Sequence, residues 1–205
     1  MGLRERAELW SALLLAAATV ATAYSAYEAT RWGGVQATSF TQAGASRTES
    51  SKALSEGFSL VGIDAGLFTQ YAVAFTEGNG RLQRILERRY FRREFLPAFR
   101  EWVAQRPLRN PDAAKNPFVL DSYRPQKLVE SERLEEEASA RFEDGREANQ
   151  TSDNYVLATI FFAAVLFFAG LATKFTSDRI ALGALAFGTF VFLAGVVRLG
   201  TLPFH

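Results

Sequence analysis

The sequence predicts an all-α membrane protein, with three transmembrane helices and a long antiparallel helical hairpin domain inserted between spans 1 and 2. Three apolar runs, at 9–27, 154–173 and 179–199, are each close to the about 20 residues that cross a ~30 Å hydrocarbon core. The run at 154–173 continues a charged segment without a Pro or a turn cluster. One helix is therefore expected to pass from water into lipid, and the domain at 28–153 is held at one membrane face.

The first span follows a charged leader, residues 1–8, and resembles a signal anchor. Ala21-Thr22-Ala23 offers a weak cleavage site, but aromatic residues at both ends favour retention, because Trp and Tyr anchor helices at membrane interfaces. These residues are Trp10, Tyr24 and Tyr27. At the other end of the chain, residues 200–205 form a short tail with the single histidine, His205, which is expected to be frayed.

A heptad pattern follows the first span and predicts a helix that packs in a coiled-coil seam. Its apolar positions are Leu54, Phe58, Val61, Ala65, Phe68, Ala72 and Phe75. Gly33-Gly34 is the expected kink, since each glycine costs about 1 kcal/mol within a helix. The Gly- and Asn-containing turn at 77–80 ends the helix.

The domain then forms a compact tip at about 78–125, with helices expected at 81–94 and 97–105. The segment 106–125 is a loop by its prolines, and its apolar residues are expected to fold back over the tip. From Gln126 the pattern is helical again, and one helix is expected to run to Thr173, over about 70 Å at 1.5 Å per residue.

The tip is rich in arginine. Nine arginines between 81 and 109 stand against three glutamates, and the candidate interaction residues are Arg84, Arg88, Arg89, Arg92 and Arg93. Pairing with the acidic stretch 130–147, within the chain or between subunits, is the favoured interpretation. A lipid or protein partner comes next, and nucleic acid comes last because the net charge is only +1.

Two smaller features could carry function. A polar neck is expected where the two hairpin helices enter the membrane, with hydrogen bonds from Gln36, Gln42, Asn149 or Gln150 that fix the register. Asp64 lies among apolar residues. We expect Asp64 to lie at the boundary between core and surface and to pair with a tip arginine. The alternative is that Asp64 is a buried functional carboxylate.

Catalytic signatures are absent from the sequence. There is no cysteine and no phosphate-binding, zinc-protease or nucleophile-elbow motif, so no catalytic residue, cofactor or metal site is predicted. No charged residue lies in the middle of a span, which argues against a secondary transporter. The small residues of the third span, among them Gly188 and Gly195, predict dense packing against another span or a second subunit.

A set of short motifs resembles uncharacterised bacterial three-span membrane proteins of the domain-of-unknown-function type. They are Trp32-x-x-x-Gln36-Ala37, Ser46-Arg47-Thr48 and the run 146–150 before the last two spans. The resemblance implies a bacterial inner-membrane protein and no enzymatic activity to carry over. Short-segment charges place the helical domain outside the cytoplasm.

The resulting hypothesis is a non-enzymatic scaffold, adaptor or sensor whose partners are the lipid bilayer and another membrane protein or a second copy. The alternative is a homo-oligomeric channel or transport accessory subunit.

Overall fold

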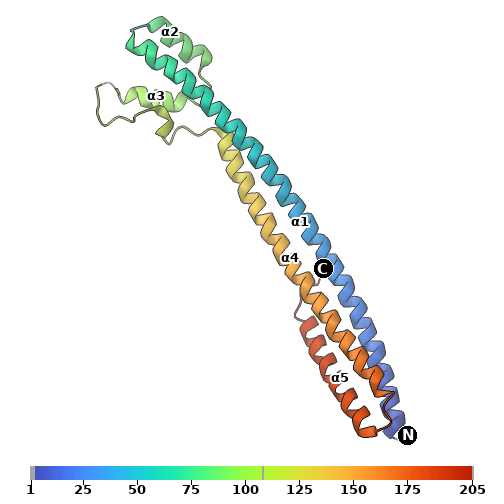
Figure 1. Ribbon diagram of the computed structural model, residues 1–205. Helices are drawn as coiled ribbons and strands as arrows, with labels where there is room; N and C mark the ends of the chain where they lie inside the picture. Colours follow the sequence, from blue (N-terminus) through green and yellow to red (C-terminus); the bar gives the residue numbers. More distant parts are fainter. Residues whose placement is uncertain (1–2, 108, 205) are drawn as a thin grey trace. The chain divides into compact units, whose positions relative to one another are not determined.

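A computed structural model of the chain describes residues 3–107 and 109–204, and the described part is helical with no strand (Figure 1). This confirms the predicted all-α class. The elements are α1 (Leu3–Thr76), α2 (Gly80–Ile85), the π-helical turn η1 (Leu86–Tyr90), α3 (Leu96–Ala104), the 3-10 turn η2 (Pro117–Val119), α4 (Gln126–Ala172) and α5 (Asp178–Leu199). The helices α1, α4 and α5 each contain a stretch long and apolar enough to cross a membrane.

The two long helices are continuous. Gly33 and Gly34 lie inside α1, which continues through them as one helix, and the kink expected there stays a prediction. The 47-residue helix α4 matches the predicted run from Gln126 almost to Thr173. The predicted helix 81–94 is shorter in the structure, because the backbone turns extended at Phe91 (φ −66°, ψ 129°). Met1, Gly2 and His205, at the ends of the predicted leader and tail, lie outside the described residues.

The contacts of the chain divide it into two compact units, residues 1–41 with 141–205 (unit 1) and residues 42–140 (unit 2). In unit 1, α5 lies beside the first part of α1 and the last part of α4 (Figure 1). Their shared core contains Leu14, Ala18, Val165, Ala169, Ala172 and Leu185. A Cβ on Gly195 would lie 2.9 Å from the ring of Phe162, so α5 packs as closely as its small residues predicted.

The tail of the chain packs against unit 1. Leu202 is buried in a cluster with Ala29 and Tyr155. The Pro203 carbonyl accepts hydrogen bonds from the Trp32 indole (3.2 Å) and the Tyr155 hydroxyl (3.1 Å). The tail therefore packs within this unit as far as Pro203, whereas His205, the residue expected to be frayed, lies outside the described residues.

In unit 2 the buried face of α1, toward α4 and the tip, lies largely one residue before the predicted seam, although Phe68 packs against the tip core as predicted. The inward positions of α1 include Ser50, Ala53, Gly57, Asp64 and Tyr71. Each of these except Ser50 lies one residue before a predicted position. Leu54 and Phe58, expected in the seam, are instead 41% and 61% exposed. Small inward side chains let α4 approach α1 closely, since a Cβ on Gly57 would lie 2.5 Å from the Leu128 side chain.

The tip of unit 2 has an aromatic core. Its buried members are Tyr71, Leu86, Phe91, Phe95 and Phe99, and Phe68, Trp102, Phe118 and Tyr123 pack against them. The rings contact mostly edge to face, an arrangement favoured by their quadrupoles, as in the Tyr71–Phe99 pair at 4.7 Å and 86°. The helix predicted at 97–105 is α3, with Pro97 in its first turn. Phe118 and Tyr123 confirm that the loop folds back, whereas Val119 is 66% exposed.

Candidate functional site

The centre of the tip holds a buried carboxylate. Asp64 on α1 is completely buried and accepts hydrogen bonds from Arg92 Nε (3.0 Å) and Arg92 Nη2 (2.9 Å) in a bidentate pair. The Tyr123 hydroxyl donates a third bond, of 2.9 Å, to the same carboxylate. The expected pairing with a tip arginine is thus present, but Asp64 lies deeper than the boundary position that the sequence suggested.

The electrostatics of this cluster favour a structural role. The hydrogen bond to Asp64 raises the pKa of Arg92, so the guanidinium stays charged. Burial, followed by the bond to Asp64, raises the pKa of Tyr123, which keeps its hydroxyl a donor. Both carboxylate oxygens are engaged by these donors. Asp64 therefore ties α1 to the segment after η1 and to the loop before α4.

The other tip arginines lie on the surface. Of the four remaining candidate residues, Arg84, Arg88, Arg89 and Arg93 are all exposed. Of the nine arginines between 81 and 109, Arg92 is the only one with an ion pair to a described residue.

The acidic stretch of α4 pairs elsewhere. Within unit 2, Lys127 contacts Glu130, Arg133 contacts Glu137 and Arg47 contacts Glu135. In unit 1, Arg146 contacts Glu143. Pairing of the tip with the acidic stretch inside one chain is therefore wrong for the part that the structure describes, where four of the eight acids pair instead with cations on their own helix or on the facing part of α1. Pairing between subunits stays a prediction.

The polar neck does not form as expected. Gln36 and Asn149 are half-buried and Gln150 is exposed in unit 1, and Gln42 is exposed in unit 2. Asn149 donates to Asp153 on its own helix (3.3 Å), and none of the four residues bonds across to the other long helix in the described structure.

Serines set the register instead. Ser152 donates to the Ala29 carbonyl (2.9 Å) in unit 1, and Ser50 donates to the Ser131 carbonyl (2.9 Å) in unit 2. A short hydroxyl reaches a backbone carbonyl only when the helices are close, whereas a long amide side chain extends past the contact to solvent. The helices also approach closely at Gly145, which the ring of Phe40 covers in unit 1.

A groove lies on the tip between the last turns of α1 and α3. Its volume is about 530 Å³, and its walls include Tyr71, Phe75, Trp102, Val103, Arg106 and Arg109. We call it the aromatic groove. Phe75 and Val103 are 40% and 42% exposed, so the groove presents apolar surface to water.

Arg106, at the rim of the aromatic groove, has an unusual backbone. Its φ of 53° is the only positive φ outside glycine in the described chain. It directly follows Gln105, the C-cap of α3, at the position where glycine usually ends a helix in the left-handed conformation. A residue with a side chain, such as Arg106, costs about 1–2 kcal/mol of folding free energy in this conformation.

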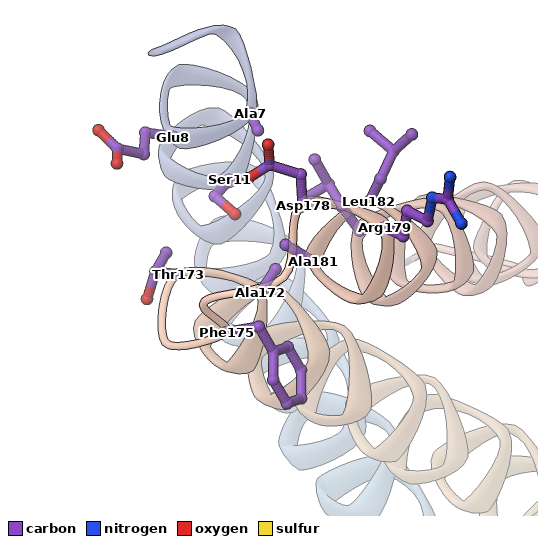
Figure 2. Close-up of a pocket in the computed structure, with 11 residues that line it drawn as sticks. Ala7, Glu8, Ser11, Ala172, Thr173, Phe175, Asp178, Arg179, Ala181 and Leu182 are labelled. Atoms are coloured by element: carbon purple, nitrogen blue, oxygen red, sulfur yellow. The ribbon is translucent and has the colours of Figure 1, made fainter. Parts of the chain in front are cut away.

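A second cavity, of about 250 Å³, lies in unit 1 between the start of α1 and the link from α4 to α5 (Figure 2). Asp178 leans toward Ser11, while Glu8 and Arg179 point away from it (Figure 2). The Ser11 hydroxyl already donates to the Ala169 carbonyl (3.2 Å). The polar groups around this cavity do not converge on one point, so it has no catalytic arrangement.

One buried acidic residue, Glu28, could not be predicted from the sequence. Glu28 is 4% exposed in unit 1, next to Ala29 of the cluster that holds Tyr155 and Leu202. The sequence marks it only as the first charged residue after an apolar run. No group of three or more acidic or histidine residues arranged for a metal ion occurs among the described residues.

Comparison with protein-family models, with curated proteins and with solved structures finds no match to this chain. Any statement about its function therefore rests on its own residues.

Proposed function

We propose that the chain is a non-enzymatic, three-span membrane protein that acts as an adaptor through its helical domain, and that the exposed arginines of the tip bind an anionic protein partner. The observation that carries this proposal is the surface arginine cluster at Arg84, Arg88, Arg89 and Arg93, which forms no ion pair with a described residue and belongs to a tip with an aromatic core. A bacterial plasma membrane, with the domain outside the cytoplasm, is the location that the sequence favours.

The residue types support a protein partner over a lipid surface. All the basic residues between 81 and 109 are arginine, whose planar fork binds carboxylates in bidentate pairs. Tyr90 is 58% exposed beside them, and Leu82 and Ile85 are each 37% exposed. Tyrosine and arginine together are enriched at the centre of protein interfaces.

The candidate spans support an adaptor over a channel. Thr19, Thr22 and Ser25 each donate to the carbonyl four residues back in α1. Thr159 and Thr189 do the same in α4 and α5. Hydroxyls used in this way leave the outer faces of the helices apolar, as lipid-facing surfaces are, and Val20 and Phe190 are 70% and 69% exposed.

The experiment is a binding titration of the full chain in zwitterionic lipid nanodiscs with a fluorescent polyglutamate peptide. Replacing Arg84, Arg88 and Arg89 by Gln should weaken binding by up to about 150-fold, because three exposed contacts of up to about 1 kcal/mol each sum to about 3 kcal/mol. A matched variant with Lys52, Arg133 and Arg141 replaced by Gln removes the same charge from the domain outside the tip, and should bind like the parent.

Two results would contradict the proposal. Equal losses in the two triple variants would show that only net charge matters. Binding to vesicles of anionic phospholipid in preference to polyglutamate would assign the arginine surface to a membrane instead of a protein.

A further inference from the structure

We propose that the aromatic groove is a binding site for a small anionic amphiphile, an apolar ring or chain that carries a carboxylate or phosphate. The arginines of the adaptor surface do not line it. The two proposals therefore concern different residues and can fail independently.

The walls of the groove supply the apolar contacts. Tyr71 and Phe75 lie one turn apart on α1 with their rings stacked at 6.1 Å, and Trp102 and Val103 face them from α3. The Trp102 indole N–H is already bonded to the Ala114 carbonyl (2.8 Å), so the ring offers the groove only apolar surface. A volume of about 530 Å³ falls in the range of small-molecule pockets, about 300–1,000 Å³, and is too small for a protein helix.

The rim supplies the charge. Arg106 and Arg109 line the groove, and neither forms an ion pair with a described residue. The carbonyls at the end of α3 accept hydrogen bonds from the backbone N–H groups of Gln105 and Arg106. These bonds do not involve the arginine side chains. Two arginines in the lining of an aromatic groove, neither with an ion pair to a described residue, favour a ligand with a negative head and an apolar body.

The backbone of Arg106 indicates that its side chain is used. Glycine would fit the left-handed conformation after α3 without strain, yet the chain keeps an arginine there. Strained residues of this kind concentrate at binding sites. Substitution by glycine should therefore relieve strain and remove a ligand contact in the same step.

The test uses the full chain in zwitterionic nanodiscs with Trp10→Phe and Trp32→Phe, so that Trp102 in the groove wall is the only tryptophan. Its fluorescence is titrated with 2-naphthoate, with decanoate and with neutral 2-naphthylmethanol, and empty nanodiscs correct for partitioning into lipid. We expect an anion to bind about tenfold or more tightly than the neutral alcohol, the ratio given by one charge-assisted contact. Preference for naphthoate identifies a soluble aromatic acid, and preference for decanoate identifies a lipid-derived chain.

Variants separate the site from the fold. Arg106→Gly and Arg109→Gln should each weaken anion binding about tenfold. Arg100→Gln, which removes a charge from α3 outside the groove, should change it less than about twofold. Arg106→Gly should also melt no earlier than the parent, so its weaker binding cannot come from unfolding.

The proposal is overturned if neither anion changes Trp102 fluorescence, if the neutral alcohol binds equally well, or if Arg106→Gly keeps the parent affinity. A full loss of polyglutamate binding in the triple arginine variant, with naphthoate binding intact, would leave this site standing beside the adaptor surface.

Discussion

Replacing Asp64 by Asn tests how the tip is held together. The substitution keeps the shape of the side chain but removes the buried counter-ion of the Arg92 guanidinium, which then keeps only its contact with Glu94 (3.4 Å). Removing one partner of a fully buried ion pair costs about 3–5 kcal/mol. The Arg92 side chain is 21% exposed and can be hydrated in part, and Asn still accepts one hydrogen bond. We therefore expect a smaller loss of stability, about 2–3 kcal/mol. This corresponds to a shift of about 30- to 150-fold in the equilibrium from the closed toward the open tip.

Amide hydrogen exchange of residues 86–104 in the full chain measures this opening. Asp112→Asn, an exposed acid in the same tip, is the matched control and should exchange like the parent. Exchange of the Asp64→Asn tip within about threefold of the parent would refute the assignment of Asp64 as the main tie of the tip.

A triple replacement distinguishes structure from chemistry at the same cluster. Asp64→Leu with Arg92→Met and Tyr123→Phe exchanges the polar cluster for apolar side chains of similar size, which is often neutral or stabilising by about 1–4 kcal/mol. Slow exchange should return in this variant. If this triple variant also binds polyglutamate like the parent, Asp64 has a structural role. If its exchange is slow but its binding is weaker, the carboxylate has a functional role.

Three further predictions follow from other parts of the structure. Gly57→Ala should destabilise unit 2 by about 1–3 kcal/mol, because the added Cβ would meet the Leu128 side chain. Gly62→Ala has open space around it and should stabilise the helix by up to about 1 kcal/mol. Thermal unfolding of the two variants measures the difference. The raised pKa of Tyr123 gives a stability contribution that is full below the unfolded pKa of about 10 and is lost as pH rises above it. Alkaline unfolding of the tip, followed by Trp102 fluorescence, should therefore lose part of its pH dependence in Tyr123→Phe, and an unchanged profile would contradict the burial of this hydroxyl. An introduced Asn110→Cys should react with an impermeant thiol reagent on intact cells, and reaction only after lysis would reverse the predicted orientation.

The long helices could be predicted from the sequence because their signals are local. Apolar runs, the turn at 77–80 and the prolines of the loop each act within a few residues, so α4 and the end of α1 lie where they were expected. Gly33-Gly34 did not interrupt α1, since two weak residues are outweighed by the many residues that continue the helix on both sides.

The seam and the charge pairing could not be predicted in the same way. The largest apolar residues were assumed to face inward, but Leu54 and Phe58 lie outside while Ser50 and Gly57 lie inside, because close helix approach selects small residues. The near balance of tip arginines and α4 acids suggested a pairing. Ion pairs need atoms within about 4 Å, however, and charge totals carry no information on position. The bidentate partner of Asp64 could be anticipated only as one of several arginines.

The π-helical turn η1 makes the tip sensitive to its length. The Phe91 N–H bonds to the Leu86 carbonyl (2.9 Å), five residues back, so this turn holds one residue more than an α-helical turn would. Deleting a single residue between 86 and 90 would restore ordinary helical spacing and rotate the following chain by about 100°. Phe91 and Phe95 would then leave the aromatic core together. Substitutions at the exposed arginines of this turn leave the spacing intact, so natural variation at the tip should alter the identity of surface residues and preserve their number.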